Sequence, residues 1–161
     1  MKPSLWKLLV IILAGAVAVS CVAPATADQS SAKAVVTSLY ARLQAGRYDD
    51  AVTLLRATDG SVLAAATQAT VRQSWESALK GRTFRVTSIT LTAERPLEDD
   101  ARALLPTGAD AVRLTLEVDG ESDAPCWTLP LKNGTVSAAR IDDRWYLIEE
   151  LHFAGSYVVR C

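Results

Sequence analysis

Apolar residues recur at intervals of three and four positions in the stretch that begins near residue 32. They are Val35, Val36, Leu39, Tyr40 and Leu43. This spacing predicts an amphipathic helix. Ser30 or Ser31 can cap its start, and Gly46 stands where a residue just past the end of a helix is expected.

Two more helices are predicted before the strands begin. The first is short and follows the turn GRYDD, with apolar residues at Ala51, Val52, Leu54 and Leu55. The second lies in TQATVRQSWESALKG (67–81), where Trp75 belongs to an apolar face. Thr70 and Gln73 have the spacing of a capping box near its start, and Gly81 ends it.

From Phe84 onward the apolar period changes to two, which is the period of a half-buried strand. Strands are predicted at 84–94, 111–119, 126–132, 135–141 and 144–151. Asn133-Gly134 has the composition of a hairpin turn, and Asp142-Asp143 turns the chain into the last strand. This order predicts an α+β fold, with N-terminal helices packed on a curved antiparallel sheet of four to five strands.

The first twenty residues have the pattern of an export signal. Lys2 and Lys7 precede twelve uninterrupted apolar residues at 8–19, too few for a transmembrane helix, which takes about 20. A charged start, a short apolar core and small residues after it are typical of a signal peptide. We therefore expect residues 1–20 to be removed when the protein is exported.

Two processing sites compete in AVSCVAPATADQ (18–29). AVSC resembles the lipobox of bacterial lipoproteins, although Ala18 stands where leucine is typical. The competing A-x-A site ends at Ala27, before Asp28. We expect the lipoprotein route, with lipid on Cys21 anchoring the exported protein to the cell membrane, and secretion after a cut following Ala27 is the alternative.

The chain has three cysteines, and both routes leave the same two available for pairing. Cys21 is either acylated or discarded, so Cys126 and Cys161 remain in an oxidising compartment, where a disulfide is expected. Closing a loop of about 35 residues stabilises the fold by roughly 3–4 kcal/mol in the chain-entropy model.

Composition divides the mature chain into a stalk and one domain. Residues 21–31 are rich in Ala, Pro, Thr and Ser and predict a flexible stalk, and residues 32–161 are long enough for a single core.

The signal carries two lysines and no acid, so its loss changes the net charge from −1 to −3. No run of basic residues exists, so we expect no nucleic-acid partner.

A set of aromatic residues and one acid are candidates for lining a ligand pocket. They are Tyr40, Trp75, Phe84, Trp127, Trp145 and Glu149. Ligand sites are usually apolar and aromatic, but large rings also fill cores. Both interpretations stay open for these rings.

Four segments together resemble the nuclear-transport-factor-two-like superfamily, and in particular its small exported bacterial members. They are QAGRYDDAVTLL, TVRQSWESALKG, FRVTSI and IDDRWYLIEEL. The resemblance matches Tyr48 and the turn that follows it, Trp75, and the pair Trp145-Tyr146, and it covers about residues 32–153. It implies a cone in which helices lie across the concave face of a bent sheet, with a pocket open at one end. Enzymatic members carry an Asp/His or Asp/Tyr constellation in that pocket, which has no residue-by-residue match in this chain.

His152 is the only histidine and therefore the first candidate general base. Period two places it on one face with Glu150, whereas Glu149 shares a face with Trp145. Asp119 opens an acidic turn that lacks the glycine and the later glutamate of a calcium loop. We expect no metal ion and no cofactor.

These observations favour a non-enzymatic envelope protein that binds a small apolar ligand or another envelope protein. The alternative is an isomerase-like or cyclase-like enzyme using Glu149 or His152. A third hypothesis is a homodimer formed through the open sheet face.

Overall fold

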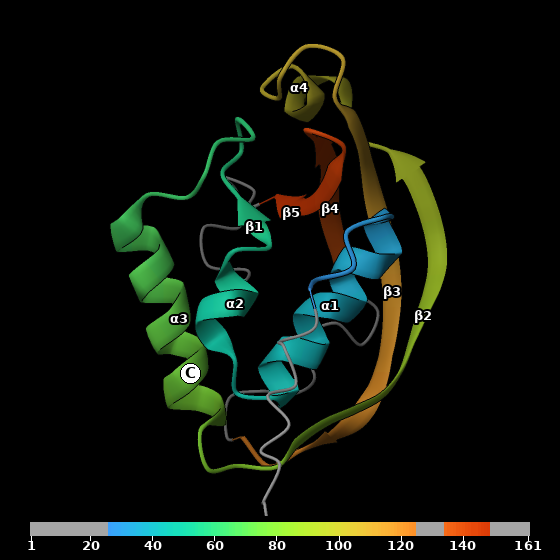
Figure 1. Cartoon of the computed structure of the whole chain (residues 1–161). Helices are drawn as coiled ribbons and strands as arrows, with labels where there is room; N and C mark the ends of the chain where they lie inside the picture. The colour runs from blue at the N-terminus through green and yellow to red at the C-terminus, as the bar shows by residue number, and fades with distance from the viewer. Residues whose placement is uncertain (1–25, 125–133, 149–161) are drawn as a thin grey trace, which may run out of the picture.

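The computed structural model describes residues 26–124 and 134–148, in which the three longer helices cover one face of an open five-stranded sheet (Figure 1). The helices are α1 Ala32–Gln44, α2 Tyr48–Val52, α3 Ala65–Leu79 and α4 Asp99–Arg102. The strands are β1 Leu55–Arg56, β2 Phe84–Pro96, β3 Asp110–Ser122, β4 Gly134–Ile141 and β5 Arg144–Ile148. The predicted α+β class is confirmed. None of the described helices is long and apolar enough to cross a membrane.

The sheet has the strand order β1-β5-β4-β3-β2. The four longer strands pair antiparallel, as predicted, whereas β1 pairs in parallel with β5 through Leu55 and Leu147. The prediction that Leu54 and Leu55 are helical was wrong. The helix ends at Val52, and the carbonyl of Leu54 accepts a hydrogen bond from the Leu147 N–H at 3.0 Å.

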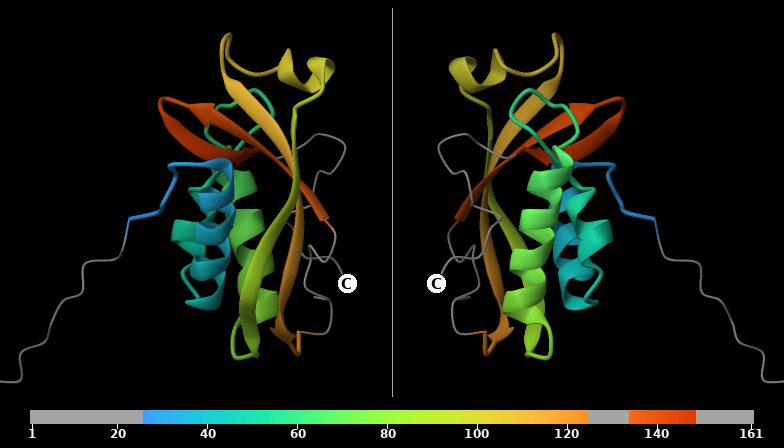
Figure 2. Two further views of the ribbon diagram at one scale, coloured as in Figure 1. Left: turned by 90° about the vertical axis from the view of Figure 1, so that its right-hand side faces the viewer. Right: turned by 90° about the vertical axis from the view of Figure 1, so that its left-hand side faces the viewer.

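The long pair of β2 and β3 forms one side of the molecule and curves around the helices (Figure 1, Figure 2). Two bulges interrupt its register, between Val86 and Ser88 and between Leu91 and Ala93. Gly120 lies opposite Val86, beside the first bulge. A Cβ at this position would meet the backbone of Arg85, so the two strands approach closely only because the residue is glycine.

The main core lies between the helices and the sheet. On β3 the alternating residues Leu114, Leu116 and Val118 are fully buried, which confirms the predicted period. Helices α1 and α3 add the rings of Tyr40 and Trp75 to the same cluster. A helix that covers a sheet in this way needs only one apolar face, which explains the spacing along α1.

A second, smaller core lies on the other face of the sheet, because its residues alternate with those of the main core. It consists of Leu97, Leu105, Ala111, Ala139 and Ile148. The short helix α4 adds Ala101 to it.

The predicted helix boundaries are partly right. Ser31 caps α1, accepting a hydrogen bond from the Ala34 N–H at 3.1 Å, and Gly46 follows α1 with φ 67°. The capping box at Thr70 was wrong because α3 begins five residues earlier, at Ala65. Thr70 lies inside the helix, where its hydroxyl donates to the Ala66 carbonyl.

The turn between β4 and β5 is the one predicted at Asp142-Asp143. Both residues are left-handed, with φ 49° and 62°, a conformation that aspartate tolerates better than most residues. The strand predicted at 126–132 and the hairpin residue Asn133 lie outside the described residues.

The segment that leads into α1 is bonded to the domain. Gln29 exchanges two hydrogen bonds with Trp145 on β5, one from its side-chain amide at 2.8 Å and one to its carbonyl at 3.0 Å. The Ser38 hydroxyl donates to the Asp28 carbonyl at 3.0 Å, and Ala27 packs against the main core. The last residues of the predicted stalk therefore contact the folded domain.

Candidate functional site

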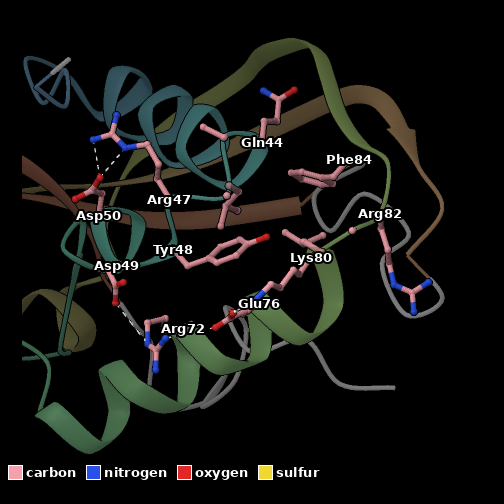
Figure 3. A pocket seen from close by; sticks show the side chains of 15 residues that line it. Gln44, Arg47, Tyr48, Asp49, Asp50, Arg72, Glu76, Lys80, Arg82 and Phe84 are labelled. Carbon is pink, nitrogen blue, oxygen red and sulfur yellow. Dashed lines mark hydrogen bonds and ion pairs between the residues drawn. The ribbon is translucent and has the colours of Figure 1, made fainter. Parts of the chain in front are cut away.

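A groove of about 710 Å³ opens where α1 ends, beside α2 and the C-terminal half of α3 (Figure 3). Its lining comes from both helix ends and the start of β2. The charged and aromatic members are Arg47, Tyr48, Asp49, Asp50, Arg72, Glu76, Lys80, Arg82 and Phe84. Leu43, Gln44 and Leu79 complete its walls together with small residues of the turns.

Two left-handed glycines shape the groove. Gly46 lets the chain leave α1, after which the Arg47 N–H donates to the Arg42 carbonyl at 2.9 Å. Gly81, with φ 75°, turns the chain from α3 toward β2. The Val86 N–H then donates to the Gln44 side-chain oxygen at 2.6 Å, which joins the end of α1 to β2. These turns bring the end of α1, the end of α3 and the start of β2 around one opening.

Ion pairs line the rim of the groove on the helix side. Arg47 pairs with Asp50, with Nε and Oδ2 2.6 Å apart. Arg72 reaches both Asp49 of α2 and Glu76 of α3 at 3.4 Å, and Lys80 contacts Glu76 at 2.8 Å. The pair between Arg72 and Asp49 links the two helices across the rim. Such exposed pairs contribute little to stability, so their effect here is to give the rim fixed charges.

An apolar wall faces these charges. Leu43 and Leu79 are buried beneath the groove, and Phe84 is half-buried at its edge. The ring of Phe84 stacks on Tyr40, with centroids 6.4 Å apart. The ring of Tyr48 extends across the groove toward Lys80 (Figure 3). The groove therefore offers apolar ring surface and charged groups within one opening.

Three titratable groups of the groove, Tyr48, Glu76 and Lys80, have shifted pKa values with clear causes. The hydrogen bond from Lys80 lowers the pKa of Glu76 below its usual value, and the same contact raises the pKa of Lys80. Burial raises the pKa of Tyr48. All three shifts favour the form that each group already has at neutral pH, which suits binding rather than proton transfer.

One cation differs from the others. Among the described residues no ion pair involves Arg82, which lies at one end of the groove, apart from the paired charges (Figure 3). Within the described ranges, no group of three His, Cys, Asp or Glu side chains could hold a metal ion. The acidic turn expected around Asp119 is part of β3, where Asp119 accepts a hydrogen bond from Ser88.

The structure separates the predicted pocket residues. Tyr40 and Trp75 are 2% and 1% exposed and belong to the main core, and Trp145 packs against it from β5. Only Phe84, of these four, lines the groove. Trp127 and Glu149 lie outside the described residues, as do His152 and the cysteines Cys21, Cys126 and Cys161. The pocket role of Trp127 and Glu149, the lipidation and the disulfide therefore stay predictions.

No family model, curated protein or solved structure matches this chain. The superfamily resemblance thus remains an inference from the sequence motifs.

The charged rim was not predicted from the sequence. One signal was present, because Arg72, Glu76 and Lys80 follow each other at intervals of four and must share one side of a helix. The same spacing is typical of an ordinary solvated helix face. Only the position of Arg47 and Asp49 opposite this side reveals a groove.

Proposed function

We propose that this chain is an exported, lipid-anchored protein of the cell envelope that binds a small amphipathic ligand in the groove without catalysing a reaction. The observation that carries this proposal is the combination of the Phe84 and Tyr48 rings with Arg82, a cation with no ion-pair partner among the described residues. A ligand with an apolar ring and one anionic group would place the ring on the apolar wall and the anion beside Arg82.

The electrostatics of the groove support binding rather than catalysis. Glu76 has a lowered pKa and Lys80 a raised one. A general base or acid works best with a pKa near the ambient pH, and these shifts move both groups away from it. The groove instead presents charges that stay fixed over a wide pH range, which is what recognition of a charged ligand requires.

Two further observations support the rest of the proposal. Three helices lie on one face of a curved sheet, and a groove opens beside the ends of α1 and α3. This arrangement supports the cone that the resemblance to the nuclear-transport-factor-two-like superfamily implies. Ala27 packs against the main core. A cut after Ala27 would remove this contact, worth up to about 0.8 kcal/mol per buried carbon, whereas a cut before Cys21 keeps it.

The binding site is tested with 1-anilinonaphthalene-8-sulfonate, which combines aromatic rings with one anion. We expect saturable fluorescence enhancement, and Arg82→Ala should weaken binding about tenfold, the effect of losing one charge-assisted contact of about 1.4 kcal/mol. Arg102→Ala on α4 is the matched control, because it removes an exposed arginine outside the groove. Equal affinities for the two variants would contradict the proposed site.

The anchoring is tested by intact mass spectrometry of the protein isolated from its native membrane. We expect a diacylglyceryl group on Cys21, and a mass lower by two protons for a bond between Cys126 and Cys161. A chain that starts at Asp28 would contradict the anchor, and a free thiol on Cys126 or Cys161 would contradict the disulfide.

A further inference from the structure

The hydroxyl of Tyr48 is a polar group of the groove that binding of a ring and an anion does not use. Tyr48 is the first residue of α2, and its half-buried ring extends across the groove toward Lys80 (Figure 3). Among the described residues, this hydroxyl has no hydrogen-bond partner. A phenolic hydroxyl can donate and accept a hydrogen bond, so a ligand in the groove can bond to it.

Lys80 adds further donors at the same place. An ammonium group has three N–H donors, and in the described part of the chain the ion pair of Lys80 is with Glu76, at 2.8 Å. The side chain of Lys80 is 74% exposed. Tyr48 and Lys80 are close enough for each to shift the pKa of the other. The end of α3 therefore offers a hydroxyl and an ammonium group that can both donate to one oxygen atom of a ligand.

The carboxylate of Glu76 makes this place unfavourable for a negative charge. Its two oxygens contact Lys80 and Arg72, one turn along α3 on either side. Burial is the largest cause of the raised pKa of Tyr48, and Glu76 raises it further by more than Lys80 lowers it. At the Tyr48 oxygen the negative charge of Glu76 thus outweighs the positive charge of Lys80. An anionic group placed there would meet this repulsion and would also lose hydration.

The end of the groove at Arg82 has the reverse preference. Arg82 has no ion pair with any described residue and lies apart from the paired charges (Figure 3). It favours an anion, whereas the hydroxyl of Tyr48 and the spare donors of Lys80 favour an uncharged oxygen. The polarity along the groove therefore specifies which end of a ligand is charged.

We propose that Tyr48 and Lys80 form a second polar subsite of the groove, which binds an uncharged oxygen acceptor at the end of the ligand opposite its anion. The ligand class is then an aromatic monoacid with a carbonyl, ether or hydroxyl oxygen across the ring, and Glu76 excludes aromatic diacids. This inference rests on the proposed function, in which an aromatic anion binds beside Arg82, and it adds the group that is recognised at the other end.

Three ligands of nearly the same shape test the subsite by competition with 1-anilinonaphthalene-8-sulfonate, at about pH 7.5, where benzoic acids are ionised. In para-acetylbenzoate an uncharged oxygen lies across the ring from the anion. In para-isopropenylbenzoate carbon replaces that oxygen, and terephthalate has a second anion in its place. We expect para-acetylbenzoate to bind about threefold more tightly than para-isopropenylbenzoate, for one added hydrogen bond. It should bind about tenfold more tightly than terephthalate, which meets the charge of Glu76.

Two variants identify the residues responsible. Tyr48→Phe should abolish the preference for para-acetylbenzoate over its isopropenyl analogue, because the ring stays and only the hydroxyl is lost. Glu76→Gln should reduce the discrimination against terephthalate about tenfold, because the repelling charge is gone and Lys80 can pair with the second anion. Tyr146→Phe and Glu98→Gln are the matched controls, since they make the same changes outside the groove.

The outcomes separate the subsite from the proposed function. Equal affinities for the acetyl and isopropenyl compounds overturn the subsite alone, as does terephthalate binding as tightly as para-acetylbenzoate. A preference that persists in Tyr48→Phe, or a discrimination that persists in Glu76→Gln, also overturns it. If none of the three acids displaces the dye, or if Arg82→Ala leaves their affinities unchanged, the proposed function fails and the subsite with it.

Discussion

Replacing Gly120 with alanine tests the close approach of β2 and β3. The added Cβ would lie against the Arg85 carbonyl oxygen, and 2.9 Å from both the Arg85 carbonyl carbon and the Val86 Cα. Ordinary contact begins at 3.4 Å, so the strands must separate by at least half an ångström. All three atoms are backbone, and no side chain can move aside instead. We expect a loss of roughly 3 kcal/mol in the free energy of unfolding, the upper part of the usual range for overpacking.

The assay is urea unfolding of the protein, followed by circular dichroism. Gly46→Ala is the matched control: its Cβ meets nothing within 4 Å, and it loses only the roughly 1–2 kcal/mol of a left-handed residue. The midpoint should fall further for Gly120→Ala, with the denaturant slope unchanged. A Gly120→Ala protein within about 1 kcal/mol of the wild type would refute the reasoning. Because Phe84 is two residues before Val86, weaker dye binding should accompany the loss of stability.

Three other predictions follow from burial and charge. Trp75→Ala should lower the free energy of unfolding by about 4 kcal/mol. The loss should exceed that of Trp145→Ala, because Trp75 is 1% exposed whereas Trp145 is only partly buried. Equal losses in urea unfolding would contradict this prediction. Burial raises the pKa of Tyr40 far above its usual value of 10.0. The folded protein then keeps a proton that the unfolded chain loses, so stability should decline as the pH rises above 10.0, and Tyr40→Phe should reduce that decline. Lys80→Met should raise the pKa of Glu76 toward its ordinary value, as measured by carboxyl-carbon NMR; no change would contradict their contact.

The longer elements could be predicted because each has a strong period of its own. Leu114, Leu116 and Val118 alternate over enough residues for the strand to be identified, and their burial follows directly. β1 has only two residues, too few to show alternation. β1 is a strand because it pairs with Leu147 of β5, which is distant in the sequence. The local pattern does not contain this partner, so Leu54 and Leu55 look like the continuation of the preceding helix.

The candidate site was harder to predict than the fold. Aromatic residues were expected as candidates for lining a pocket. Tyr40 and Trp75, the two described members of that set that lie on helices, fill the core instead. A hydrophobic residue is expected to be buried, but its hydrophobicity does not tell whether the side chain packs in the core or lines a groove. The groove depends on charged residues and on two turns, at Gly46 and Gly81, whose geometry no local pattern specifies.

The bulges of β2 also affect how the protein behaves at high concentration. β2 is the last strand of the sheet in the described part of the chain, and its outer edge is a template on which the strand of another molecule could form. The bulges divide its pairing into segments of three or four residues, 84–86, 88–91 and 93–96. A neighbouring strand would lose register at each break. A long exposed strand can thus remain in a concentrated solution of the protein without starting an intermolecular sheet.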